Sequence, residues 1–131
     1  MNLFFRYWLP VLAQMALIFY LSSRSSFPVE VPPWAFFADK LVHAVLFGFL
    51  ALLFMRAWIA GQWENLSRFA GIVTVLFVTG YGITDEVHQM FVPERNPSLA
   101  DIAADTSGAV IVWLVIWMIR KKDTKKNAGT P

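Results

Sequence analysis

Cysteine is absent from this sequence of 131 residues, and charged residues are scarce. Without cysteine, the chain can form neither a disulfide framework nor a thiolate site. Charged residues make up only 15% of the chain, whereas hydrophobic residues make up 57% and aromatic residues 16%. A soluble domain of this size leaves much of its surface in water and needs more polar residues to cover it. The composition therefore favours a single domain whose solvent is the lipid bilayer.

The basic residues do not indicate a nucleic-acid-binding surface, although the net charge is +2 and the pI is about 9.2. Most of them flank apolar runs or lie in the tail "RKKDTKK". In such places anionic lipid head groups are the expected neighbours. We therefore expect membrane lipids as partners, and no nucleic acid.

Four apolar segments have about the length of a membrane-spanning helix, which needs about 20 residues with a range of roughly 17–25. They cover residues 7–22, 41–60, 69–91 and 99–119. The first is short, but the "SSRSSFP" after it lacks a small-x-small cleavage site, so we expect it to be retained. The sequence thus predicts an all-α integral membrane four-helix bundle over residues 1–120. We expect the basic tail, residues 121–131, to be disordered.

Lysine and arginine predict the orientation of the bundle, because they are enriched in cytoplasmic loops. If all four segments cross, eight basic residues share one side: Arg6, Arg56, Arg68, Arg120, Lys121, Lys122, Lys125 and Lys126. Only three fall on the other side: Arg24, Lys40 and Arg95. This distribution predicts that both termini are cytoplasmic.

Acidic residues are distributed in the opposite way. Seven of them lie at or near the predicted outer side: Glu30, Asp39, Asp85, Glu86, Glu94, Asp101 and Asp105. Carboxylates contribute little to membrane topology, so this asymmetry requires another cause.

Three ionisable groups from three helices are expected at similar depths. From a helix rise of about 1.5 Å per residue, Asp85 lies roughly 9 Å, Asp105 about 10 Å and His43 about 6 Å from the outer ends of their helices. Intramembrane ionisable groups usually face the bundle or a wet cavity, because facing lipid is costly. The sequence therefore predicts a polar pocket that opens outward.

Several of these residues also have structural interpretations. Ser98 and Asp101 form an S-x-x-D pattern, which is typical of a capping box at a helix start. Asp39 is equally suited to cap the second helix, and His43 alone is consistent with a hydrogen-bonded packing histidine. We expect four glycines to allow close helix packing: Gly48, Gly80, Gly82 and Gly108.

The motifs "DKLVHAVLFG" and "YGITDEVHQMFVPERNPSLADIAADTSGA", together with "LSSRSS", resemble those of the VanZ-like family of small bacterial membrane proteins. The resemblance covers nearly the whole chain except the basic tail. It implies a multi-pass protein of the bacterial inner (cytoplasmic) membrane and, through the family's namesake, an association with teicoplanin resistance. It implies no settled activity. The signature positions are Asp39, Lys40, His43, Asp85, Glu86, His88, Gln89, Pro93, Arg95, Asp101, Asp105 and Gly108.

The first functional hypothesis is chemistry on a phosphate-bearing envelope lipid, such as a polyprenyl-linked cell-wall precursor. Candidate catalytic residues are His43, Asp85, His88 and Asp105. Candidate substrate-binding residues are Asp39, Lys40, Glu86, Gln89, Arg95 and Asp101. Carboxylates and imidazoles are suitable ligands for a divalent metal, but no H-E-x-x-H motif is present, so a metal is not favoured.

Three other functions fit the same residues. The pocket could bind an envelope lipid without performing chemistry, or its acids and histidine could relay protons in a transporter. The absence of an evident inverted repeat counts against transport. Finally, the polar residues could serve packing in a membrane scaffold. The sequence leaves catalysis and oligomeric state open.

Overall fold

The computed structural model describes residues 2–24, 33–60 and 69–128 and shows four helices there. These are α1 (Leu3–Ser22), α2 (Pro33–Ala60), α4 (Ala70–Gln89) and α5 (Leu99–Ala128). Each contains an apolar stretch long enough to cross a membrane: Phe4–Ser22, Phe36–Ala60, Ala70–Gln89 and Leu99–Lys122. The predicted all-α fold with four membrane-length helices is confirmed.

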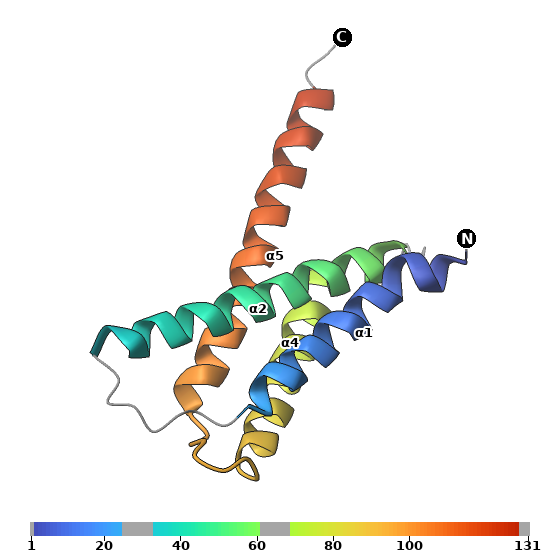
Figure 1. Cartoon of the computed structure of the whole chain (residues 1–131). Helices are drawn as coiled ribbons and strands as arrows, with labels where there is room; N and C mark the ends of the chain where they lie inside the picture. Colours follow the sequence, from blue (N-terminus) through green and yellow to red (C-terminus); the bar gives the residue numbers. More distant parts are fainter. Residues whose placement is uncertain (1, 25–32, 61–68, 129–131) are drawn as a thin grey trace.

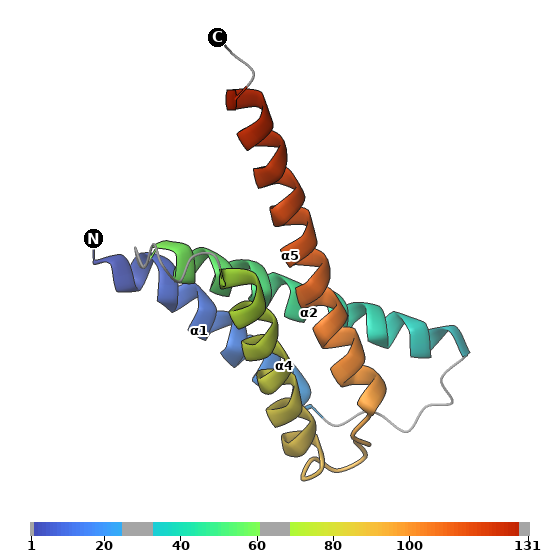
Figure 2. The same cartoon turned by 180° about the vertical axis from the view of Figure 1, so that it is seen from behind.

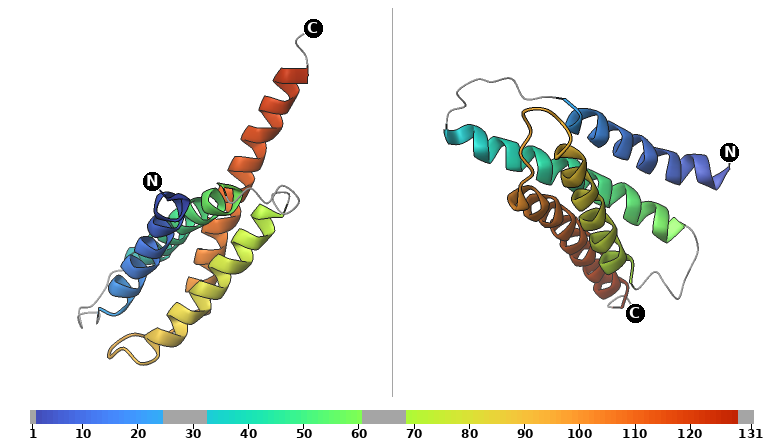
Figure 3. Two further views of the ribbon diagram at one scale, coloured as in Figure 1. Left: turned by 90° about the vertical axis from the view of Figure 1, so that its right-hand side faces the viewer. Right: turned by 90° about the horizontal axis from the view of Figure 1, so that it is seen from below.

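The four helices form two layers. α1 and α2 lie side by side and run in opposite directions (Figure 1). α5 crosses α2, with which it shares the most extensive interface, and α4 runs beside the first half of α5 (Figures 2 and 3). The second half of α5 extends away from the other helices (Figure 1). The polar residues of α2, α4 and α5 therefore meet along the first half of α5, where both α2 and α4 lie against it.

The core lies where α1, α2, α4 and α5 meet. Phe54 of α2 stacks on Phe77 of α4, with ring centroids 4.0 Å apart. The buried apolar side chains that cluster there are Val11, Ile18, Phe47, Leu50, Ala51, Phe54, Ala57, Val78 and Ala109. Outward-facing apolar residues remain exposed, among them Leu76 at 68%. Such a surface suits helices whose outer faces contact hydrocarbon.

Glycines allow the close approach of α2 and α5. A Cβ atom on Gly108 would lie 2.1 Å from a backbone carbonyl oxygen of α2 and 3.0 Å from the backbone nitrogen of Gly48. Gly82 similarly lies against a buried carboxylate of α5. The predicted packing role is thus confirmed for these three glycines. It is wrong for Gly80, because no atom of another described helix lies within 4 Å of the position of its Cβ.

Three helices are longer than their apolar runs predicted, and the first of them, α1, already begins at Leu3. α2 begins at Pro33, where proline is favoured because the first turn needs no N–H donor. Asp39 therefore lies inside α2 and does not cap it, contrary to one interpretation. α5 continues to Ala128, so most of the tail 121–131 is helical, which differs from the expected disorder. Each residue that extends an existing helix adds one hydrogen bond, whereas starting a helix fixes several residues for a single bond. A helix can therefore continue beyond its apolar residues.

Candidate functional site

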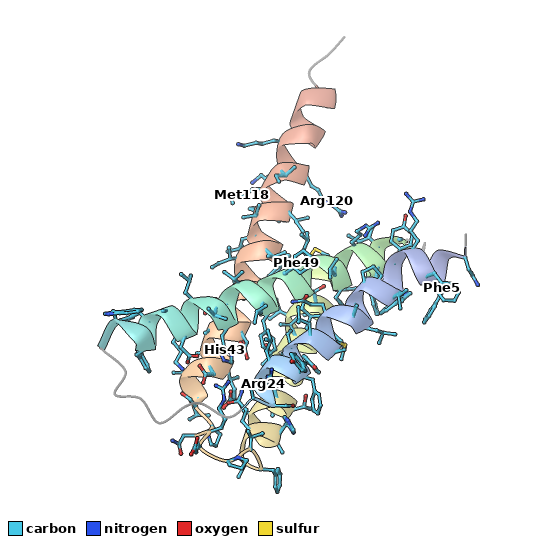
Figure 4. All side chains as sticks on the ribbon, viewed as in Figure 1. Phe5, Arg24, His43, Phe49, Met118 and Arg120 are labelled. Atoms are coloured by element: carbon cyan, nitrogen blue, oxygen red, sulfur yellow. The ribbon has the colours of Figure 1, made fainter. Side chains whose placement is uncertain are left out.

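His43 of α2 and Asp105 of α5 form a hydrogen bond between the two helices. His43 Nδ1 lies 3.0 Å from Asp105 Oδ1. The Asp105 side chain is completely buried, and that of His43 is 13% exposed. Asp105 precedes Gly108 by about one helical turn, so the close approach at this glycine brings the short aspartate side chain within reach of the imidazole. Figure 4 places His43 between α2 and the first half of α5.

Lys40 links the same two helices one turn further along. Its Nζ atom lies 2.8 Å from Asp39 Oδ2 and is also bonded to Asp101 Oδ1. The Nε2 atom of His43 lies 4.0 Å from that same oxygen of Asp101. Lys40 and His43 are three residues apart and share a face of α2, as Asp101 and Asp105 share a face of α5. The two pairs therefore form consecutive polar contacts along one interface.

Asp101 is available for Lys40 because another acid performs the capping function. Ser98 Oγ accepts a hydrogen bond from the backbone N–H of Ala100 at 3.2 Å, as expected for a capping serine. In a capping box the acid three residues later accepts the N–H of the capping residue. Here Glu86 of α4 accepts the N–H of Ser98 instead. The predicted capping box is thus half correct: Ser98 caps α5, whereas Asp101 forms an ion pair with Lys40.

α4 contributes a buried carboxylate and amide. Gln89 Nε2 donates to Asp85 Oδ2 at 3.0 Å, and both residues are buried. The other carboxylate oxygen of Asp85 has no hydrogen-bond partner within the described part of the chain. Both residues line a cavity of about 230 Å³. The polar residues that line it are Ser22, Asp39, His43, Asp85, Gln89 and Arg95.

His88 and Arg95 connect α1 to the end of α4. His88 Nε2 lies 2.9 Å from Ser23 Oγ, and the His88 ring packs against Phe19 with centroids 4.4 Å apart. Arg95 Nε donates to the backbone oxygen of Arg24 at 3.1 Å. Arg95 also lines the cavity, whereas His88 is not among its lining residues.

The structure thus brings together most of the ten predicted site residues. Five line the cavity: Asp39, His43, Asp85, Gln89 and Arg95. Three more contact this group, namely Lys40, Asp101 and Asp105. Glu86 and His88 form contacts elsewhere. The site prediction omitted Ser22, a cavity-lining residue, although it lies in the "LSSRSS" motif.

Asp39, His43 and Asp101 could together hold a metal ion. One ligand atom from each lies within 4.8 Å of the others, and two carboxylates with one imidazole suit a divalent cation. The ammonium group of Lys40 contacts both carboxylates in this structure. A metal would therefore have to displace Lys40 from them.

Four membrane-length helices joined by buried polar contacts define a multi-pass helical membrane protein. The family model described as VanZ/LLP1 matches residues 2–120. The chain therefore belongs to the VanZ-like family, which confirms the resemblance in its motifs. Comparisons with curated proteins and with solved structures gave no match.

Proposed function

We propose that this protein acts on a phosphate-bearing lipid of the bacterial cell envelope, such as a polyprenyl-linked cell-wall precursor, in an outward-facing pocket of the cytoplasmic membrane. The contact between His43 and Asp105 carries the proposal. Its Nδ1–Oδ1 distance is 3.0 Å, and it lies within membrane-length helices. Buried ionisable groups of this kind are costly in a membrane and typically mark functional sites.

Asp105 gives the imidazole a defined chemical role. If Nδ1–H donates to the carboxylate, Nε2 keeps its lone pair, so the tautomer and the ring orientation are both fixed. Nε2 can then act as a general base. The proton of an attacking water or lipid hydroxyl passes to Nε2 while the oxygen bonds to phosphorus. The leaving oxygen departs with the electron pair of the broken P–O bond and is protonated in turn.

The cavity has groups that suit a lipid head group. Arg95 lines it, and a guanidinium group binds phosphate oxygens in a fork-like geometry. Asp85 keeps one buried carboxylate oxygen without a partner among the described residues, so it can accept a hydrogen bond from a hydroxyl group. The volume of about 230 Å³ is below the roughly 300–1,000 Å³ of drug-sized ligand sites. It suits a head group better than a whole lipid.

The test uses the full chain in lipid nanodiscs with a radiolabelled polyprenyl phosphate or diphosphate. We expect release or transfer of the labelled phosphate. H43Q and D105N should each lower kcat about 10²- to 10⁴-fold, since a general base contributes this much. S107A is the matched control, because the exposed Ser107 lies two residues after Asp105 and its hydroxyl donates to the Ala103 carbonyl of its own helix, at 2.6 Å.

Other outcomes would contradict the proposal. Saturable binding without any product would indicate a non-catalytic lipid-binding protein. Solute flux that follows a pH gradient in proteoliposomes would indicate a transporter. Full activity of both variants would indicate that the polar contacts serve packing. Teicoplanin susceptibility of cells carrying each variant tests the link to resistance, which we propose follows from altered envelope-lipid supply.

A further inference from the structure

A second cavity lies at the opposite end of the bundle from His43. It has a volume of about 510 Å³ and is formed by the first turns of α1, the end of α2 and the second half of α5. The residues that matter here are Tyr7, Leu52, Arg56, Ala60, Ile116 and Arg120, all of which line it. We call this cavity the arginine groove. It shares no lining residue with the cavity at His43.

Positive charge is concentrated at the arginine groove. Arg56 and Arg120 are both exposed side chains that line it. The guanidinium of Arg56 lies 4.8 Å from the centroid of the Tyr7 ring, and that of Arg6 lies 5.5 Å from the same ring. None of the described lining residues is acidic. Figure 4 shows Arg120 on the side of α5 that faces α1 and the end of α2, and Met118 on the other side.

The remaining walls of the arginine groove are apolar. Leu52 of α2 is 43% exposed, and Ile116 of α5 also lines the groove. Anionic lipid head groups are attracted to basic residues at the membrane surface. The groove therefore combines an anion-binding end with walls that fit hydrocarbon chains.

We propose that the arginine groove binds an anionic phospholipid, with its phosphate held by Arg56 and Arg120 and its acyl chains lying against Leu52 and Ile116. Two guanidinium groups match a phosphate in charge and in hydrogen-bond geometry. The volume of about 510 Å³ lies within the roughly 300–1,000 Å³ typical of ligand sites. The distribution of lysine and arginine predicts that this end faces the cytoplasm, where the membrane surface is negative. This site shares no lining residue with the cavity at His43, so lipid binding there can be measured without the proposed chemistry.

The test is native mass spectrometry of the full chain released from detergent, titrated with phosphatidylglycerol or with phosphatidylcholine that carries the same acyl chains. We expect tighter binding of phosphatidylglycerol. The double variant R56Q/R120Q should weaken that binding by roughly tenfold or more for each arginine, as expected for charge-assisted hydrogen bonds. The matched control K121Q/K122Q removes the same charge from exposed residues of α5 that do not line the groove. It should change binding by less than about threefold, since such contacts are solvent-exposed.

A second variant distinguishes lipid binding inside the groove from attraction to a basic surface alone. A60W keeps both arginines but fills the groove with an indole, so it should weaken phosphatidylglycerol binding while the helix content measured by circular dichroism stays unchanged. Equal losses in R56Q/R120Q and K121Q/K122Q would overturn the proposal. Equal affinity for the two lipids, or full binding by A60W, would overturn it as well.

Discussion

Gly108 is the position at which a single methyl group should test the packing of α2 and α5. In G108A the new Cβ would lie 2.1 Å from the Ala44 carbonyl oxygen and 3.0 Å from the Gly48 nitrogen. Both atoms belong to the backbone, so no flexible side chain can move to make room. A carbon and an oxygen in close contact are about 3.3 Å apart, so the helices must separate locally by roughly 1 Å.

The cost of this separation can be compared with a gain in helix propensity. Overpacking of a well-packed interface costs about 1–3 kcal/mol, and we take the upper value here because the clashing atoms belong to the backbone. Replacing glycine by alanine inside a helix returns up to about 1 kcal/mol. We therefore expect G108A to lower the free energy of unfolding by about 2 kcal/mol. The His43–Asp105 hydrogen bond lies about one turn away and should lengthen.

Reversible unfolding in mixed micelles, followed by tryptophan fluorescence, measures this change. The matched control is G80A, since within the described ranges no neighbouring helix has an atom closer than 4 Å to the position of the Gly80 Cβ. G80A should raise the free energy of unfolding by up to about 1 kcal/mol. The same chemical change should thus have opposite signs at two glycines. Equal effects of G108A and G80A would refute the argument for a close backbone contact.

Two further predictions concern the ion pair and the cap. K40M leaves the carboxylate of Asp101, whose side chain is 7% exposed, without its lysine, so the free energy of unfolding should fall by about 3 kcal/mol. K40M/D101N should recover most of this loss in the same unfolding assay, and no recovery would show that the two side chains do not act as a pair. E86A leaves the Ser98 N–H without its acceptor and should cost about 1–3 kcal/mol. Faster hydrogen exchange at Ser98 would locate the effect, and unchanged exchange would contradict the assignment of Glu86 as the cap partner.

The helices could be predicted because the lipid-spanning length appears directly in the sequence as apolar runs. The helix ends at Ser22 and Ala60 and the helix start at Leu99 were predicted correctly. The starts of α1 and α2 and the end of α5 were not, because residues outside the apolar run continue a helix once it has formed. α5 accordingly extends to Ala128, beyond the last apolar residue of the predicted span. The family motif and the depth argument both identified His43, Asp85 and Asp105, which the structure brings to one region.

The sequence did not predict which side chains of different helices contact each other. The S-x-x-D pattern is the same whether Asp101 folds back on its own helix or reaches Lys40 on another. His88 follows Asp85 by three residues, yet it bonds to Ser23, the residue directly after α1. Gly80 and Gly82 are two residues apart on a helix and so point in different directions, and only Gly82 meets a neighbouring helix. Such differences depend on helix rotation, which local spacing does not specify.

The close contact with α2 at Gly108 divides α5 into two halves. The first half carries Asp101 and Asp105, and the second half carries Ile116 and Arg120. A rigid helix that tilts about a contact point moves its two ends in opposite directions. A ligand that pushes one half of α5 away from α2 would therefore move the other half as well. Occupancy of the cavity at His43 and occupancy of the arginine groove would then be thermodynamically linked, and each occupant would alter the affinity for the other by the same factor.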